Sequence, residues 1–410
     1  MKKILCLFDY KARTGFARVS ENIIPHLRKH YKEKLQLDII AINYFGEPFD
    51  EDEHTHVVSA RLNDFKDDPF GRNFFCKMLS DYDYDGIFII MDSGGIIPVI
   101  PVIKHIKEEK KKRGIKNFKS ILYFPVDCAM IPELVKDIEF FDKLITYTEY
   151  GRDMVCKLRP ELRPKLEVLP HGINTKQFYP MDFDSILKFR KEYFGKENAD
   201  KFIFTNVSRN QFRKDIPTTI FAYQHLLGLI KEQGLDYEPF LYIHAHPEDP
   251  LGWNLRAIFH QTDLVEDVHY KLLPKQHEKE MVTDEMLNAI YNASDCMLTT
   301  TLGEGWGFIY SEAAAAKTPI VAPYSTSFKE MSGYGKNGYM AETIIPFCSL
   351  EDNIIREQVD YIEIAELMLT SMDEREFKKV DKMISANYNW VIGTEWSILA
   401  KRWVELFKIY

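Results

Sequence analysis

Two glutamates stand in a glycine-rich stretch of the chain, TTTLGEGWGFIYSEAAAAKTPIVAP at residues 299–323, with Glu304 in an expected turn and Glu312 in the helix that should follow. Glycines at positions 303, 305 and 307 would let the backbone approach a ligand and direct a helix N-terminus at it, which suits a diphosphate with an adjacent sugar. Because phosphate repels carboxylate, Glu304 is better suited to accepting hydrogen bonds from sugar hydroxyls, and Glu312 from a ribose diol. The alternative is an ordinary glycine-rich turn with a capping glutamate.

Basic side chains follow another expected strand, in NVSRNQFRKDIP at residues 206–217, which supplies Arg209, Arg213 and Lys214. A reaction that expels a nucleoside diphosphate must stabilise negative charge on the leaving oxygen, and fixed cations do this without a metal ion. Arg209 and Lys214 are the candidates for that role. The alternative is a set of solvated side chains on a surface loop.

A third candidate is Gly15, in the turn DYKARTGFARVS at residues 9–20. Gly15 opens an expected helix and would let backbone amides approach an anion. The turn has one glycine where a dinucleotide-binding fingerprint has three, so a dehydrogenase is disfavoured.

No metal ion is expected. The six cysteines, at positions 6, 76, 128, 156, 296 and 348, form no CxxC pair and have no histidine at ligand spacing, which indicates neither a zinc site nor a disulfide framework. The acidic run DYDYD at residues 81–85 resembles a manganese-binding motif, but it precedes its strand and should lie at the wrong edge of the sheet.

The elements that must position these residues alternate between apolar runs of strand length and stretches of helical period, which is typical of parallel sheets covered on both faces. Two series of strands are expected, at residues 4–8, 37–42, 86–91, 120–126, 143–148 and 166–170, and then at 202–208, 240–246, 268–273, 296–301 and 319–323. Ligands of such sheets bind beyond the carboxyl ends of the strands, where the candidate residues lie.

The two series predict two doubly wound, Rossmann-like domains. We place the first at residues 1–175, the second at 176–390, and a linker at about 174–182, where Gly172, Pro180 and short polar residues break the periodicity. The last segment, residues 391–410, should be a helix that crosses back to the first domain. Its stripe of Trp396, Leu399, Trp403 and Leu406 is interpreted as packing.

The composition of the 410 residues, 45% hydrophobic and 28% charged, is that of a globular protein, and the net charge of -9 argues against nucleic acid as a partner. The basic run KEEKKKR at residues 107–113 is interpreted as a solvated helix end, with peripheral membrane contact as the alternative. The short apolar N-terminus, which ends in Asp9, suggests a strand, and no stretch reaches the roughly 20 apolar residues of a membrane span. We expect a cytoplasmic protein.

The pattern of Glu304 and Glu312 in EGWGFIYSEAAAAKTPIVA, preceded by the loop of Arg209 and Lys214, resembles the retaining glycosyltransferases of family 4, which have the GT-B fold. The resemblance covers most of the chain, including the Gly15 turn, LPHGINTKQFYP as linker, YNASDCMLTTT before the glutamate turn, and a closing helix with tryptophan. Some features also resemble members encoded by large DNA viruses.

The resemblance implies two domains facing across a cleft, with the acceptor in the first and the nucleotide-sugar donor mainly in the second. Arg209, Lys214 and, from the opposite domain, Gly15 would hold the diphosphate. Glu304 and the backbone of residues 305–308 would hold the sugar, and Glu312 the ribose. The donor-binding stretch is Gly305, Trp306, Gly307 and Phe308. Where many relatives have a histidine, this chain reads FPVDCAMIP, and Asp127 is the substitute, placed to stabilise an oxocarbenium-like centre or to orient the acceptor.

The implied reaction retains the anomeric configuration: an acceptor hydroxyl attacks from the side of the leaving group and its proton passes to the departing phosphate. The expected donor is GDP-mannose, otherwise UDP-glucose, and the acceptor a glycan or another hydroxyl compound. No cofactor is expected. A nucleotide-sugar epimerase of the same fold and a noncatalytic sugar-nucleotide binding protein remain the alternatives.

Overall fold

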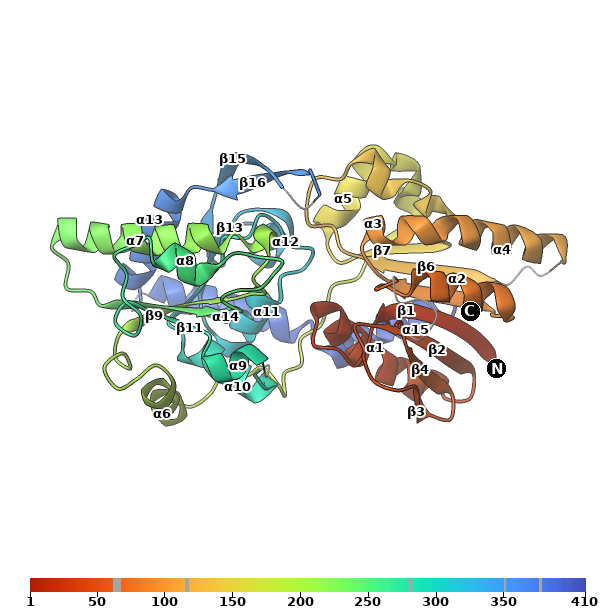
Figure 1. The fold of residues 1–410 in the computed structure, drawn as a ribbon, viewed down its shortest axis with the longest axis horizontal. Coiled ribbons are helices and arrows are strands. Elements are labelled where there is room, and N and C mark those ends of the chain that lie inside the picture. The colour runs from red at the N-terminus through yellow and green to blue at the C-terminus, as the bar shows by residue number, and fades with distance from the viewer. Residues whose placement is uncertain (62–67, 115–117, 280–281, 350–351, 376–377) are drawn as a thin grey trace. The chain divides into compact units, whose positions relative to one another are not determined.

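The computed structural model describes residues 1–61, 68–114, 118–279, 282–349, 352–375 and 378–410. The chain forms two compact units. Unit 1 comprises Met1–Val126, Met130–Gly172 and Trp396–Tyr410, and unit 2 comprises Asp127–Ala129 and Ile173–Glu395. Each unit is a sheet covered by helices on both faces, and the strands expected from the sequence are all present (Figure 1). The α/β fold class is therefore confirmed.

Unit 1 is built on an eight-stranded sheet in the order β3-β4-β2-β1-β5-β6-β7-β8. All neighbours are parallel except β3 and β4. The strands are β1 (Lys2–Asp9), β2 (Leu35–Ile42), β3 (Phe49–Asp52), β4 (Thr55–Ser59), β5 (Gly86–Ile90), β6 (Lys119–Phe124), β7 (Lys143–Thr146) and β8 (Leu166–Val168). The sequence did not predict β3 and β4, because FDED has no apolar pattern and THVVS is short.

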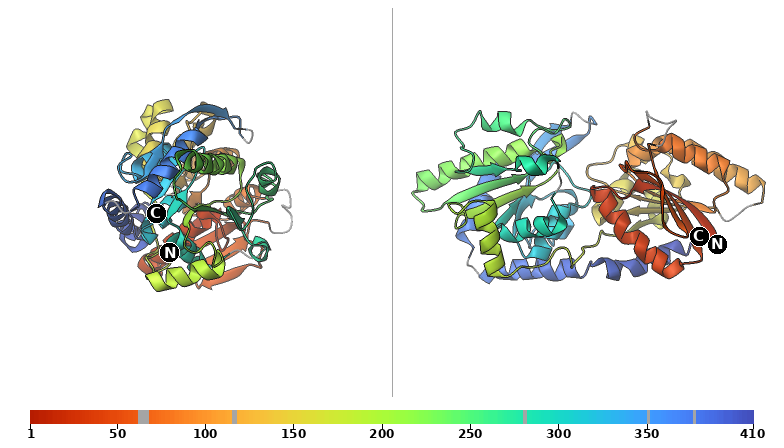
Figure 2. Two further views of the ribbon diagram at one scale, coloured as in Figure 1. Left: turned by 90° about the vertical axis from the view of Figure 1, so that its left-hand side faces the viewer. Right: turned by 60° about the horizontal axis from the view of Figure 1, so that its bottom comes forward.

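The helices of unit 1 lie on both faces of this sheet, with α1 and α4 on opposite sides (Figure 2). They are α1 (Gly15–Tyr31), α2 (Arg72–Asp81), α3 (Ser93–Ile96), α4 (Ile100–Lys112), α5 (Glu149–Leu158) and α15 (Trp396–Phe407). Helix α1 continues through Pro25. The tryptophan stripe of α15 is buried, and Trp403 packs against Phe88 with ring centroids 5.8 Å apart, which confirms its interpretation as packing.

Unit 2 contains a six-stranded sheet in the order β11-β10-β9-β12-β13-β14, parallel throughout. Its strands are β9 (Phe202–Val207), β10 (Pro239–His244), β11 (Tyr270–Leu272), β12 (Cys296–Leu298), β13 (Ile320–Pro323) and β14 (Tyr339–Ala341). The helices are α6 (Phe183–Tyr193), α7 (Ile216–Gln233), α8 (Leu255–Phe259), α9 (Lys275–Lys279), α10 (Asp284–Ala293), α11 (Phe308–Ala316), α12 (Thr326–Met331), α13 (Tyr361–Asp373) and α14 (Lys378–Ile392).

A separate antiparallel hairpin follows the sheet of unit 2. It consists of β15 (Thr343–Cys348) and β16 (Ile355–Val359). The sequence pattern did not predict this hairpin.

Among the described residues, no helix combines the length and the apolar character that a membrane crossing requires. The basic run at residues 107–113 lies at the end of α4, as predicted, but it is only partly solvated. Lys110 is buried and pairs with Asp83 at 2.7 Å, and Lys107 pairs with Asp142 at 2.6 Å.

Candidate functional site

The topology of unit 2 brings two predicted loops together. β9 lies between β10 and β12, so the order of strands reverses at the gap between β9 and β12. Met297 of β12 pairs with Thr205 of β9, and both strands point the same way. The loops that follow them therefore leave neighbouring strands at the same edge, which is where open α/β sheets bind ligands. One loop carries Lys214 and the other carries Glu304.

Glu304 is held between two cations. Lys214 Nζ bonds to Oε1 of Glu304, and Arg213 Nη1 lies 3.3 Å from Oε2. Arg213 also donates to the carbonyl of Gly303. The backbone N–H of Glu304 donates to Thr326 Oγ1 at 3.0 Å. Glu304 is only 6% exposed. Each oxygen of its carboxylate therefore meets a cation in a buried environment.

Charge controls the ionisation of this cluster. Burial raises the pKa of Glu304, but Lys214 and Arg213 outweigh it and lower the pKa to about 2. Glu304 is therefore an anion at neutral pH and can only accept hydrogen bonds. Burial lowers the pKa of Lys214, and the attraction of Glu304 opposes that shift. We regard the pair as ionised, because the 3.3 Å contact with Arg213 independently stabilises the carboxylate.

The neighbouring Asp215 is a buried carboxyl that the sequence analysis did not single out. Burial raises its pKa to about 6, although Gln358 and Thr218 oppose the shift through hydrogen bonds. Gln358 Nε2 donates to Asp215 Oδ2 at 2.6 Å. Asp215 has a φ of 46°, a left-handed conformation that short polar side chains tolerate. It is the N-cap residue of α7, directly after Lys214, and thereby ties the cation loop to that helix.

Two glycines of the Glu304 turn lie so close to neighbouring atoms that a side chain would not fit there. A Cβ on Gly307, whose φ is 92°, would lie 2.4 Å from Phe328 Cε1. A Cβ on Gly303 would lie 2.0 Å from the carbonyl oxygen of Asp127. Substitution at either position must therefore displace neighbouring atoms.

The predicted donor-binding residues 305–308 lie in the turn and at the start of α11. Trp306 is buried, and its carbonyl accepts from Ser327 Oγ at 2.6 Å. Gly307 precedes α11, and Phe308 is the first residue of that helix. Glu312 lies deeper in α11, is 2% exposed, and accepts a 2.7 Å hydrogen bond from the hydroxyl of Tyr291. Its contact with a ribose stays a prediction.

Arg209 lies apart from the Glu304 pair. Its side chain is 57% exposed, and its Nε lies 3.2 Å from Oδ2 of Asp249. Arg213, which the sequence also placed in this loop, is the arginine that contacts Glu304. Spacing alone did not distinguish the two arginines, because both fall in an irregular loop whose side-chain directions have no period.

Asp127 belongs to unit 2 by its contacts. Its Oδ2 lies 3.2 Å from Nε of Arg213, and its Oδ1 lies 3.4 Å from Nη1 of Arg356. Both carboxylate oxygens therefore face guanidinium groups. Arg356 lies on the hairpin strand β16, and no motif in the sequence pointed to it.

Gly15 is in unit 1, where it is the exposed first residue of α1. The N-cap is Thr14, whose Oγ1 accepts from the N–H of Ala17 at 3.0 Å. Thr14 also donates to the carboxyl of Asp9, which accepts from Asn43 at 3.1 Å. Burial raises the pKa of Asp9, and these two hydrogen bonds oppose the shift. The role of Gly15 in holding a diphosphate stays a prediction.

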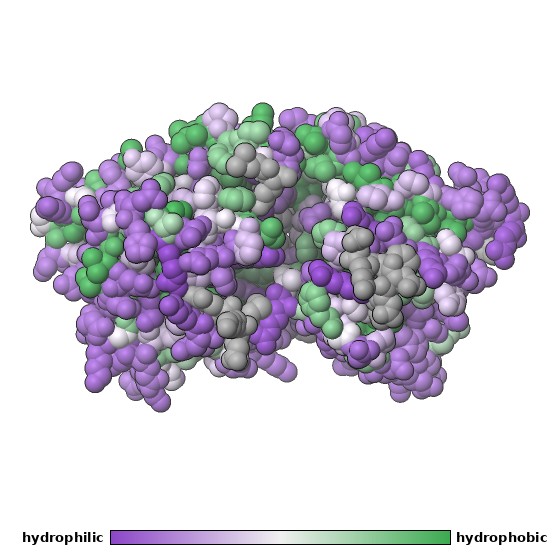
Figure 3. Space-filling view, viewed as in Figure 1, coloured by the Kyte–Doolittle hydropathy of each residue, from purple (hydrophilic) through white to green (hydrophobic). Residues whose placement is uncertain are grey.

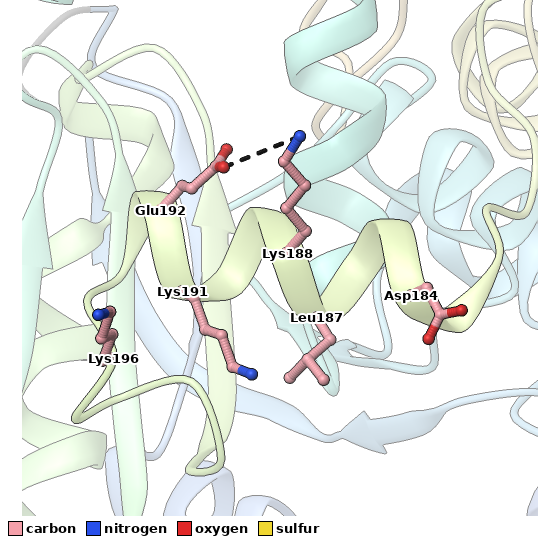
Figure 4. Close-up of a pocket in the computed structure, with 6 residues that line it drawn as sticks. All are labelled: Asp184, Leu187, Lys188, Lys191, Glu192 and Lys196. Atoms are coloured by element: carbon pink, nitrogen blue, oxygen red, sulfur yellow. Dashed lines mark ion pairs between the residues drawn. The ribbon is translucent and has the colours of Figure 1, made fainter.

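Two surface pockets contain none of the predicted site residues. One, of about 390 Å³, lies over α6 and is lined mainly by charged side chains, including Lys188, which pairs with Glu192 (Figure 4). The other is lined by Lys336, Asn337, Lys379, Lys382, Met383 and Ala386. Exposed lysines of this kind are ordinary surface features, so neither pocket indicates a binding site.

Comparison with known proteins agrees with the layout of the sheets. No family model matches the chain. A probable sucrose-phosphate synthase of Thermosipho melanesiensis is 24% identical over 195 residues, which are 48% of this chain and 41% of that relative. The chain thus matches less than half of the length of this curated relative.

Solved structures match over the whole chain. HepE of Anabaena in complex with UDP-glucose has a TM-score of 0.67 at 14% identity and covers 100% of both chains. Sucrose-phosphate synthase from Thermosynechococcus elongatus has a TM-score of 0.66 at 14% identity, covering 100% of this chain and 98% of that one. An α,α-trehalose-phosphate synthase (UDP-forming) from Burkholderia vietnamiensis has a TM-score of 0.68 at 11% identity, covering 100% and 99%. The chain therefore has the GT-B fold, with two α/β sheets of Rossmann type that are parallel except for the pair β3–β4.

Proposed function

We propose that this chain is a retaining glycosyltransferase that moves a hexose from a nucleotide-sugar donor to a hydroxyl acceptor without a metal ion. The observation that carries the proposal is the buried contact of Glu304 with Lys214 and Arg213 at the point where the strand order of unit 2 reverses. A site of this kind places a hydrogen-bond acceptor beside fixed positive charge, which is what a sugar joined to a diphosphate requires.

The roles follow from charge. Glu304, as an anion, accepts hydrogen bonds from sugar hydroxyls, whereas phosphate oxygens would be repelled by it. Lys214 and Arg213 stabilise the charge that develops on the leaving diphosphate, and Arg209 from the same loop adds a more exposed cation. Because the cations are already fixed by their contacts, little reorganisation is needed when the charge appears.

The donor we propose to test first is UDP-glucose. The structural neighbour HepE was solved with UDP-glucose, and the trehalose-phosphate synthase is described as UDP-forming. These ligands favour UDP-glucose over the GDP-mannose suggested by the family resemblance. Unit 2 would bind the donor and unit 1 the acceptor, a glycan or another hydroxyl compound. A cytoplasmic location and the likeness to viral members stay predictions.

The reaction proposed needs no nucleophile from the protein. The acceptor oxygen bonds to the anomeric carbon on the side of the leaving group, the bond to the diphosphate oxygen breaks, and the acceptor proton passes to that oxygen. A double displacement would need a carboxylate on the opposite face of the sugar. Both oxygens of Asp127 and of Glu304 face cations, which argues against either as that nucleophile.

The test is a screen of nucleotide sugars in EDTA, following thermal stabilisation and release of nucleotide. Wild type is compared with Lys214→Ala, Glu304→Ala and the matched control Lys231→Ala, an exposed lysine on α7. We expect one donor to stabilise wild type and Lys231→Ala with slow release of nucleotide, and both effects to weaken in the other two variants. Conversion of the donor without acceptor into an epimer would identify an epimerase, and binding without release a noncatalytic binding protein.

A further inference from the structure

The hairpin β15–β16 directs a charged side chain inward and apolar side chains outward. On β16, Ile355 is 67% exposed while the adjacent Arg356 is 5% exposed. Ile344 of β15 is 70% exposed, and hydrophobic residues gather over the hairpin in the space-filling view (Figure 3). Alternation along a strand ordinarily turns the apolar residues inward. The inverted arrangement costs free energy and therefore indicates that Arg356 is needed inside.

The guanidinium of Arg356 is incompletely paired. Nη2 lies 2.8 Å from Oδ2 of Asp352, and Nη1 donates to the carbonyl of Asp127 at 3.0 Å. Its buried Nε–H has no hydrogen-bond partner among the described residues. A buried charged donor that lacks a partner costs more than about 1–3 kcal/mol, so such groups are expected where a ligand completes the set.

Arg356 lies against the loop that carries Glu304. Its Nη1 is 3.4 Å from the position that a Cβ on Gly303 would occupy. Gln358, two residues along and on the same face of β16, contacts Asp215 Oδ2 at 2.6 Å and Thr218 Oγ1 at 3.1 Å. One face of the hairpin strand thus touches both loops of the candidate site, the one after β9 and the one after β12.

Three cations share this small region. Arg213 and Arg356 repel each other, and Asp127 lies between them as an anion that faces both. The carboxylates of Glu304, Asp127 and Asp352 already accompany these cations, so the Nε–H of Arg356, unpartnered among the described residues, and not the sum of charges, calls for a further acceptor. A diphosphate supplies further negative charge and accepts several hydrogen bonds from guanidinium donors. Resting on the function proposed above, we propose that Arg356 binds the distal phosphate of the nucleoside diphosphate, as a third cation beside Arg213 and Lys214.

The experiment compares affinities for a nucleoside diphosphate and the corresponding monophosphate, measured by titration calorimetry. The base is the one that wild type binds most tightly among uracil, guanine and adenine, and inorganic pyrophosphate is measured in parallel. The variants are Arg356→Gln and Arg356→Lys. The control is Arg375→Gln, which removes a 53% exposed arginine that pairs with Asp295 in the same unit.

In Arg356→Gln we expect the preference for diphosphate over monophosphate to fall about tenfold, and pyrophosphate to bind about tenfold more weakly. Arg356→Lys should lie between this variant and wild type, because it keeps the charge but not the forked donors. Arg375→Gln should keep both values of wild type. If the hairpin only supports the fold, the substitution would weaken the binding of both nucleotides equally and leave the ratio of their affinities unchanged.

An unchanged ratio in Arg356→Gln, with thermal unfolding like that of wild type, would overturn the proposal. If Arg356→Gln does not fold, the ratio of diphosphate to monophosphate affinity in Arg356→Lys decides instead. If wild type binds pyrophosphate but none of the nucleotides, the glycosyltransferase proposal fails, and the pyrophosphate affinities alone decide the role of Arg356. Wild type that binds neither would overturn both.

Discussion

The turns after β1 and after β12 occupy comparable places in their sheets but hold their polar groups differently. Each follows a strand beside the point where strand order reverses, and each leads into a helix through a glycine. After β1, Gly15 is exposed, and the buried carboxyl of Asp9 is satisfied by neutral donors. After β12, Gly307 is buried in a close contact, and Glu304 is satisfied by cations.

The difference shows that topology supplies a place for a ligand but does not supply the chemistry. Neutral donors can hold Asp9 without creating a field that an anionic ligand would feel. The cations around Glu304 create such a field and keep the carboxylate ionised. The predictions below run from the largest expected effect to the smallest. Each pairs a change after β9 or β12 with a matched change after β1, except the acid prediction for Glu304, whose control is Glu192 of α6.

The largest difference is expected from removing a cation. Lys214→Ala should lower the rate of nucleotide release from the donor by about 10²–10³-fold, because it removes a fixed charge from the leaving group. Arg13→Ala, which removes an exposed arginine from the turn after β1, should lower it less than tenfold. Turnover at saturating donor measures both. Equal losses of turnover in the two variants would mean that both turns contribute alike to catalysis, which would contradict the comparison.

Lowering the pH should destabilise the folded protein through protonation of Glu304 in the turn after β12. Its pKa falls from 4.5 unfolded to about 2 folded, so its stabilisation is complete above pH 4.5 and is lost as the pH falls towards 2. The shift corresponds to about 3 kcal/mol at neutral pH, of which about half remains at pH 3. Chemical unfolding of wild type and Glu304→Gln at several pH values measures this difference. The control Glu192→Gln, an exposed residue of α6, should show no such dependence.

Asp215 should act in the opposite direction. Its pKa rises from 3.8 unfolded to about 6 folded, so the folded state binds more protons between these values and stability falls as the pH rises through them. Asp215→Asn should remove that fall and stabilise the protein at pH 7 by up to about 3 kcal/mol. Asp9→Asn should act in the same direction, since burial also raises the pKa of Asp9. Unfolding at pH 4 and pH 7 checks both, and a destabilised Asp215→Asn at pH 7 would contradict the argument.

Much of the scaffold could be predicted from the sequence, because buried parallel strands are continuous apolar runs such as ILCLF and FIFTNV. The hairpin β15–β16 could not be predicted, since its exposed Ile344 and Ile355 and its buried Arg356 invert the usual pattern. β3 and β4, at one edge of the sheet, could not be predicted for another reason: FDED has no apolar pattern and THVVS is short.

Only those parts of the candidate site that lie in recognisable sequence motifs could be predicted. The loops with Lys214 and Glu304 were expected to lie in one sheet, and the sheet order makes them neighbours. Which arginine contacts Glu304, and that β16 adds Arg356, depend on side-chain directions in irregular loops and on a long-range strand contact. Neither leaves a periodic signal in the sequence.

The smallest effects are expected from the two glycines that precede or begin the helices. Gly307→Ala should destabilise the protein by about 1–3 kcal/mol, because a Cβ there would lie 2.4 Å from Phe328 and the φ of 92° disfavours any L side chain. Gly15→Ala should stabilise the protein by less than about 1 kcal/mol, because alanine is the better helix former at an exposed first position of α1.

Measuring donor affinity distinguishes the two glycine variants further. If Gly15 contacts a diphosphate through its backbone, as the family resemblance implies, Gly15→Ala should weaken donor binding while thermal unfolding stays close to wild type. Gly307→Ala should lower both, because the Cβ displaces the turn that holds Glu304. A Gly15→Ala variant with unchanged affinity and stability would leave the turn after β1 without a part in donor binding, and the charged turn after β12 would then account for it alone.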